Sequence, residues 1–129
     1  MGNNPSFWPD RQGFGKIFGV GGAGPSGGYF APNSILALEP GPPGEYVCER
    51  LTDEACRLIE NSDDAPFFMY LSHFNVHSPY EARVDDVERF AAKIDKDLVH
   101  QNPVMAAMLS TMDEDWVDSI ARRGQGGQM

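Results

Sequence analysis

Residues 66–80 read PFFMYLSHFNVHSPY, and this stretch decides how the rest of the chain is interpreted. The apolar run Phe67–Leu71 comes first, and two histidines, His73 and His77, follow it. Hydrophobic side chains at consecutive positions are typical of a strand that is buried on both faces, as in a sheet covered by helices. We therefore predict a central strand over residues 67–76 that runs into a polar loop.

The two histidines at the polar end have two interpretations. In α/β sheets, ligands bind just beyond the carboxyl ends of central strands, which is where His73 and His77 are expected. Their separation of four residues would place two ligands on one face of a helix. Pro79 and the apolar lead-in favour a strand running into a loop, where this spacing has no such meaning. The alternative is that both are hydrogen-bonded structural histidines, and the residues alone leave both interpretations open.

Length and charge limit the class of protein. A chain of 129 residues has the size of one domain, and its formal net charge of −9 would repel nucleic acid and anionic membranes, so we expect neither as a partner. The N-terminus lacks the basic region followed by an apolar region that is typical of a signal peptide. The sequence contains no run of about 20 apolar residues that could span a membrane. The compartment stays unknown.

The chain divides into three regions by composition and by the periodicity of its apolar residues. Residues 1–45 are rich in Gly and Pro and show no lasting period, residues 46–120 predict a helix, a strand and two further helices, and residues 121–129 predict a frayed tail. The strand needs neighbours for its backbone groups, and this chain supplies few candidates. The predicted fold class is therefore α/β, with the chain as part of a larger domain.

Helical spacing marks three segments. EYVCERLTDEACRLIENSDD places apolar side chains on one face, YEARVDDVERFAAKI does the same, and the last helix begins with Asn102 as N-cap and Pro103 as first residue. The apolar positions are, in the first helix, Val47, Leu51, Ala55, Leu58 and Ile59; in the second, Val84, Val87, Phe90, Ala91 and Ile94; and in the third, Met105, Met108, Leu109, Met112, Trp116 and Ile120.

The glycine-rich loop and the acidic pairs are weak functional signals. Gly19, Gly21 and Gly24 match the dinucleotide fingerprint G-x-G-x-x-G, but PSGGYFAPN follows, and no helix can begin there to hold a pyrophosphate. Adjacent acidic residues on a helix point in different directions, so we expect solvated surface rather than metal ligands. These acidic residues are Asp53–Glu54, Asp63–Asp64, Asp85–Asp86 and Asp113–Glu114–Asp115.

Cys48 and Cys56 lie on the first predicted helix, and eight residues on one helix separate them by about 12 Å, too far for a disulfide. A nucleophile or a metal ligand is the functional alternative. The cysteines lack C-x-x-C spacing, and no histidine sits at a companion metal spacing. We interpret both as helix-face residues, and the sequence predicts no metal ligand.

Four segments in order resemble the arylsulfatase family of the alkaline-phosphatase-like superfamily. They are WPDRQGFGKIFG (8–19), GEYVCERLTDEACRLIE (44–60), APFFMYLSHFNVHSPYEA (65–82) and NPVMAAMLSTMDEDW (102–116). Gly15 replaces the acid that usually follows GF in the first segment. The resemblance implies an α/β domain that hydrolyses sulfate esters by means of calcium and a formylglycine nucleophile. The substrate would be a small-molecule sulfate ester or a sulfated glycan.

In this resemblance only His77 matches a functional position, that of the histidine that contacts the sulfate and assists the leaving group. A histidine suits that role because it can donate a proton near neutral pH. His73 matches a position that is often histidine, without a catalytic role. The C-x-P-x-R nucleophile motif, the paired aspartates, the D-N-G segment and the lysine-histidine segment of the family are not found in this chain. We therefore expect an internal fragment of a sulfatase, inactive and poorly stable alone, with calcium and formylglycine belonging to the full-length parent.

Two alternatives stay open. One is phosphoester or phosphonate hydrolysis within the same superfamily, because the nucleophile that would discriminate it is not in this chain. The other is a truncated, non-catalytic polypeptide that binds a partner or is inert.

Overall fold

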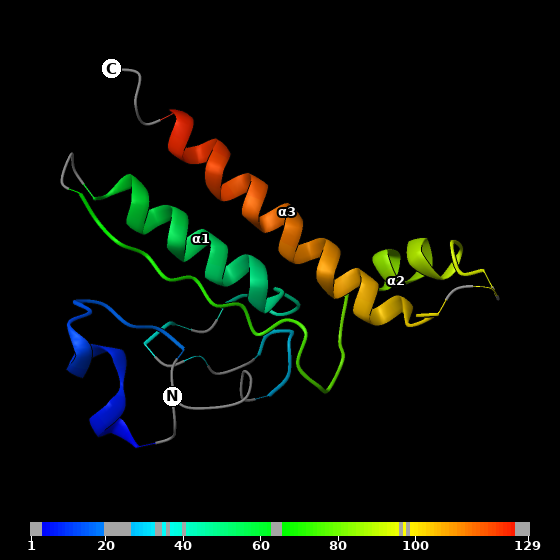
Figure 1. Ribbon diagram of the computed structural model, residues 1–129, viewed down its shortest axis with the longest axis horizontal. Coiled ribbons are helices and arrows are strands. Elements are labelled where there is room, and N and C mark those ends of the chain that lie inside the picture. Colours follow the sequence, from blue (N-terminus) through cyan, green and yellow to red (C-terminus); the bar gives the residue numbers. More distant parts are fainter. Residues whose placement is uncertain are drawn as a thin grey trace. The chain divides into compact units, whose positions relative to one another are not determined.

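The computed structural model describes residues 4–19, 27–32, 35, 37–39, 41–62, 66–95, 97 and 99–125. It forms two compact units, Met1–Val47 and Cys48–Met129. In chain order the elements are the 3₁₀ helices η1 (Pro5–Phe7) and η2 (Pro9–Gln12) and the α-helices α1 (Val47–Glu60), α2 (Val84–Ala91) and α3 (Pro103–Gln125). Figure 1 shows these elements along the chain.

The first unit consists of loops and single turns of helix, as the Gly/Pro-rich composition predicts. Asn4 caps η1 by accepting a hydrogen bond from the Ser6 backbone N–H at 3.0 Å. Gly13 ends η2 with a φ of 98°, a left-handed conformation that favours glycine. Most of the Gly19–Gly24 stretch lies outside the described residues, so the expectation that this loop does not bind a dinucleotide stays a prediction.

An isolated antiparallel bridge joins Phe30 and Tyr46 in this unit. The Ala31 N–H donates to the Glu45 carbonyl at 2.9 Å, and the Val47 N–H donates to the Tyr29 carbonyl at 2.8 Å. The Tyr46 ring lies with its centroid 4.9 Å from that of Phe30. Within the described residues this bridge is the whole of the β-structure.

The predicted first helix forms as α1. Of its five expected apolar positions, Val47, Leu51 and Ala55 are buried, and Leu58 and Ile59 are half-buried. The helix buries Cys48, Leu51, Thr52, Ala55 and Cys56, which are spaced by three or four residues and so lie on one face. Glu54, expected on the solvent face, is also buried, and its carboxylate accepts a hydrogen bond from the Arg57 Nε at 3.0 Å. Neither cysteine takes part in a disulfide, and both lie on a helix face, as predicted.

The strand predicted over 67–76 does not form among the described residues. Residues 66–73 are extended without a β-ladder, because no described segment lies beside them as a strand. Phe68 is 77% exposed and Tyr70 is 66% exposed, whereas Met69 and Leu71 are half-buried. Alternation of this kind is that of an extended segment covered on one face only. The α/β fold of the proposed parent domain stays a prediction.

The second predicted helix forms as α2 but buries none of its residues. Val84, expected on its apolar face, is 71% exposed. Arg89 connects α2 to α3, since its guanidinium donates to the Ser110 hydroxyl of α3 at 3.2 Å. It also donates to Asp86 on its own helix at 2.7 Å. Figure 1 shows α2 beside the first turns of α3.

The third predicted helix forms as α3 and begins as predicted. The Asn102 side-chain oxygen accepts a hydrogen bond from the Met105 N–H at 3.1 Å, and Pro103 is the first helical residue. The buried face consists of Ala107, Met108, Thr111 and Asp115. Of the predicted apolar stripe, Met108 is buried as expected, but Leu109 and Trp116 are 45% and 60% exposed. The helix continues through residue 125, into the segment 121–129 that the sequence predicts to be frayed.

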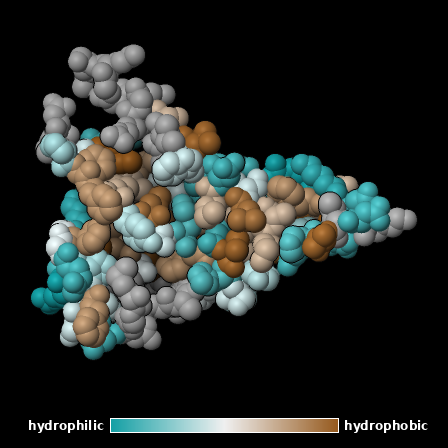
Figure 2. Space-filling view, in the orientation of Figure 1, coloured by the Kyte–Doolittle hydropathy of each residue, from teal (hydrophilic) through white to brown (hydrophobic). Residues whose placement is uncertain are grey.

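Large apolar side chains remain on the surface of the second unit. Figure 2 shows hydrophobic residues among hydrophilic ones on the face in view. Exposed patches of this kind mark surfaces that other molecules or other parts of a protein cover. They include Phe67, Phe68, Tyr70, Val84, Leu109, Trp116 and Val117. Within the described part of the chain, no helix is long and apolar enough to span a membrane.

Candidate functional site

The site is built from α1, the extended segment and α3, and its first member is Cys48. Cys48 is the second residue of α1 and is fully buried. It begins the face that continues at Leu51 and Thr52, so the helical period turns its side chain inward. Its thiol donates a hydrogen bond to the Asn75 side-chain oxygen at 2.9 Å.

Asn75 connects all three segments. Its Oδ1 accepts from the Cys48 thiol, and its Nδ2 donates to the backbone carbonyl of Met108 at 2.7 Å. Met108 is fully buried on α3. One side-chain amide therefore fixes the extended segment against two helices, which holds the residues before it in register with α1 and α3.

His73 is the second member of the site. It lies two residues after Leu71 in the extended segment, so alternation places it on the covered face. Its Nδ1 is buried without a hydrogen-bond partner. Burial lowers the pKa of the His73 imidazole from its ordinary value, because the charged form is poorly solvated there. The neutral imidazole thus keeps a lone pair that can bind a cation.

Asp115 is the third member, and α3 supplies it. It follows Thr111 by one turn on the buried face of α3, where the Thr111 hydroxyl donates to the Ala107 carbonyl at 3.1 Å. Only 7% of Asp115 is exposed. Its neighbours Asp113 and Glu114 are exposed, as predicted for the acidic triplet. The prediction of solvated surface is wrong for Asp115, because the helical period turns this residue alone inward.

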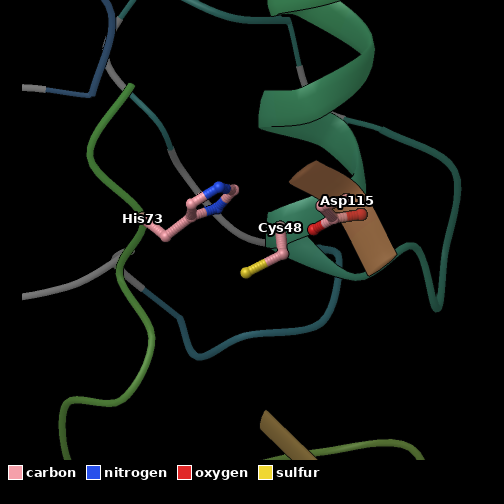
Figure 3. A group of neighbouring side chains, drawn as sticks. All are labelled: Cys48, His73 and Asp115. Carbon is pink, nitrogen blue, oxygen red and sulfur yellow. The ribbon is translucent and has the colours of Figure 1, made fainter. Parts of the chain in front are cut away.

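Cys48, His73 and Asp115 lie next to one another (Figure 3). One ligating atom of each, a sulfur, a ring nitrogen and a carboxylate oxygen, can be chosen so that all lie within 4.8 Å of one another. The three residues come from α1, the extended segment and α3. The fold of the second unit therefore gathers three different donor atoms at one buried point.

The thiol of Cys48 is held in its protonated form. Burial, the largest cause, and the nearby carboxylates of Asp115 and Glu49 together raise the pKa of the thiol to about 12, while a hydrogen bond with the Asn75 backbone opposes the rise. The nucleophile in cysteine chemistry is the thiolate, and reactive cysteines have lowered pKa values. The protonated thiol is therefore a poor nucleophile, and it can bind a metal ion only by giving up its proton.

A groove lies beside His73 of the site. It has a volume of about 440 Å³ and is lined by Leu71, His73, Leu109, Met112, Asp113 and Trp116. His73 belongs both to the groove and to the cluster. A small ion could enter along this groove and reach the imidazole first.

The structure keeps His77, the predicted catalytic and substrate-binding residue, apart from this cluster. His77 is exposed, and its backbone N–H closes a turn by donating to the Phe74 carbonyl at 3.0 Å. It is not among the three residues whose ligating atoms come together. The predicted role of His77 is untested by this arrangement and stays a prediction.

The sequence did not indicate Cys48, Asp115 or the position of His73 in one site. The three residues are separated by 25 and 42 positions, which match no ligand motif. The available signals were the helical faces, because Cys48 shares a face with Leu51 and Ala55. That pattern indicates burial of the cysteine but carries no information on what packs against it.

Calcium, which the sulfatase resemblance implies, does not fit these residues. Calcium takes six to eight oxygen ligands, usually carboxylates and carbonyls. Among the described residues, the group of side chains that could hold an ion contains a sulfur and a nitrogen. We derive no catalytic step through calcium in this chain.

Comparison with known proteins gives no family for this chain. No protein-family model matches it, and no curated protein is significantly similar to it.

Proposed function

We propose that this chain is a portion of a sulfatase-type hydrolase domain, and that it contributes the substrate histidine His77 to a parent enzyme acting on sulfate esters. The support from sequence is the order of the four resembling segments over residues 8–116. The chain has no C-x-P-x-R motif, so it carries no precursor of the formylglycine nucleophile. The chain alone is proposed to be inactive.

The observation that carries this proposal is the uncovered face of residues 67–71. Phe68 and Tyr70 point away from the half-buried Met69 and Leu71 and are largely exposed. A soluble protein rarely leaves such aromatic side chains together in water unless another surface covers them. In the proposed parent domain, a neighbouring strand and a further layer cover this face.

In that parent, His77 donates a proton to the leaving-group oxygen of the ester. Its exposure and its place just after the extended segment suit contact with a substrate. Proton donation by a positioned histidine contributes about 10²–10⁴-fold to a rate. The proton donor of this step, His77, belongs to the present chain.

The test is carried out on the extended reading frame that contains this chain. We expect hydrolysis of an aryl sulfate in the presence of calcium, and a loss of at least about 100-fold in kcat for His77→Ala, because the leaving group then departs without its proton donor. His100→Ala, at another exposed histidine, serves as the control and should leave kcat unchanged.

Three results would contradict the proposal. Turnover by the purified 129-residue chain would show that it is no inactive portion. Normal rates for His77→Ala in the active parent would remove the role of this residue. A parent that cleaves an aryl phosphate and leaves the aryl sulfate intact would replace sulfate by phosphate chemistry.

A further inference from the structure

The buried cluster of Cys48, His73 and Asp115 has a composition that the proposed hydrolase does not use. Sulfur, imidazole nitrogen and carboxylate oxygen are the three protein donors that zinc accepts, with bonds of about 2.0–2.3 Å. Hard cations such as magnesium and calcium prefer oxygen donors only. We propose that Cys48, His73 and Asp115 bind one zinc ion, with water as the fourth ligand.

The spacing of the donor atoms fits an ion after a small closure. Neighbouring ligands of a tetrahedral zinc lie about 3.3–3.8 Å apart, as the bond lengths require. The three donor atoms here lie within 4.8 Å of one another. Side-chain rotations that shorten the longest separation by about 1 Å bring them to ligating distance. The backbone segments that carry them keep their places.

The charges of the site also match a divalent cation. Zinc binding displaces the proton of the Cys48 thiol to solvent; the resulting thiolate and the carboxylate of Asp115 together carry two negative charges, and the imidazole of His73 binds in its neutral form. One zinc ion neutralises both. Paired and coordinated charges are the ones that proteins bury, so the bound site leaves no net charge in the interior.

Two further features support a ligand at this point. The buried Nδ1 of His73 has no hydrogen-bond partner, and coordination would satisfy it. In the metal-free chain the Asn75 side chain bonds both Cys48 and the Met108 carbonyl, which keeps the sulfur beside His73 and Asp115 before its proton is lost on metal binding. The groove that His73 lines gives solvent a path to this member of the cluster.

Cys56 provides a matched control. It is a fully buried free cysteine on the same helix as Cys48. Eight residues along an α-helix amount to about 12 Å, so Cys56 cannot reach the same ion. Loss of one buried thiol at either position makes a similar change to the interior, but only the change at Cys48 removes a ligand.

The experiment titrates the full, metal-stripped chain with Co²⁺ and then displaces the cobalt with Zn²⁺. We expect one Co²⁺ per chain, with a near-ultraviolet thiolate-to-cobalt absorption band that zinc abolishes. Cys48→Ser should lose the band, and Cys56→Ser should keep it. His73→Ala and Asp115→Asn should each weaken zinc binding at least tenfold, because even the partners around zinc ligands contribute about 10–100-fold.

Circular dichroism of each variant separates loss of a ligand from loss of the fold. His73→Ala changes a residue outside the helices, so it tests the site even where a variant in α1 fails to fold. The proposal is overturned if the chain binds no cobalt, if Cys48→Ser keeps the band, or if folded His73→Ala binds zinc as tightly as the unchanged chain. None of these measurements uses hydrolase activity, so they are independent of the proposed sulfatase.

Discussion

The segment 66–77 has an apolar half, residues 66–71, and a polar half, residues 72–77, and the burial of each half differs from what its side chains suggest. The apolar half carries Phe68 and Tyr70, which are 77% and 66% exposed. The polar half carries His73 and Asn75, which are partly buried and face the helices. Hydrophobic burial is therefore incomplete where the sequence favours it most, and polar contacts hold the segment where the sequence suggests a surface loop.

This difference shows that a run of hydrophobic residues is buried only on the faces that other parts of the molecule cover. A run that is hydrophobic at every position suits a strand with a covered face on each side. Here Met69 and Leu71 find cover and their neighbours do not. A hydrogen-bonding amide such as Asn75 needs only two nearby partners, and α1 and α3 supply them within this chain.

The largest expected effect concerns the polar half. Asn75→Ala should lower the free energy of unfolding by about 3 kcal/mol, because it removes two hydrogen bonds and leaves the buried Met108 carbonyl without this donor. Urea denaturation followed by circular dichroism measures the change. Asn61→Ala is the control, since Asn61 donates to the Arg57 carbonyl at the exposed end of α1, and it should cost under about 1 kcal/mol.

A small effect of Asn75→Ala would break the comparison between the two halves. It would mean that the polar half is held no more firmly than the apolar half. Equal losses for Asn75→Ala and Asn61→Ala would have the same meaning, because the exposed bond would then be worth as much as the partly buried pair.

The second prediction uses the alkaline pH dependence of the metal-free chain. Burial raises the pKa of Cys48 from 9.0 to about 12. Between these values the unfolded thiol loses its proton and the folded one keeps it, so stability falls as pH rises. The loss amounts to about 1.4 kcal/mol per pH unit above pH 9.

Denaturation at pH 8 and at about pH 10 in the presence of a chelator measures this loss. Cys48→Ser should show a shallower decline than the unchanged chain, since the serine hydroxyl does not ionise in this range. The same slope in both proteins would show that the thiol of Cys48 ionises as readily in the folded state as in the unfolded one, and that the site is open to water.

Much of the fold could be predicted from local patterns, because those patterns act over a few residues. The cap at Asn102 and the apolar spacing of α1 depend on neighbours within one or two turns, and both helices form as predicted. The face that α3 buries depends on what packs against it, and Leu109 was wrongly expected inside. The site depends on contacts between positions 48, 73 and 115, which no local period encodes.

The smallest expected effect concerns the apolar half. Phe68→Ser and Tyr70→Ser should each change the free energy of unfolding by less than about 0.5 kcal/mol, as for other exposed positions. Leu71→Ala, on the half-buried face, should cost about 1 kcal/mol or more, because it removes apolar contacts beside the groove. Urea denaturation of the three variants at equal concentration compares the two faces of one segment.

A loss above about 1 kcal/mol for Phe68→Ser would mean that its ring is covered in solution, by a second copy or by another part of the chain. Repeating the measurement at tenfold lower protein concentration separates these, because only cover by a second copy weakens on dilution. A loss that survives dilution would remove the uncovered face on which the proposal of a larger parent domain rests.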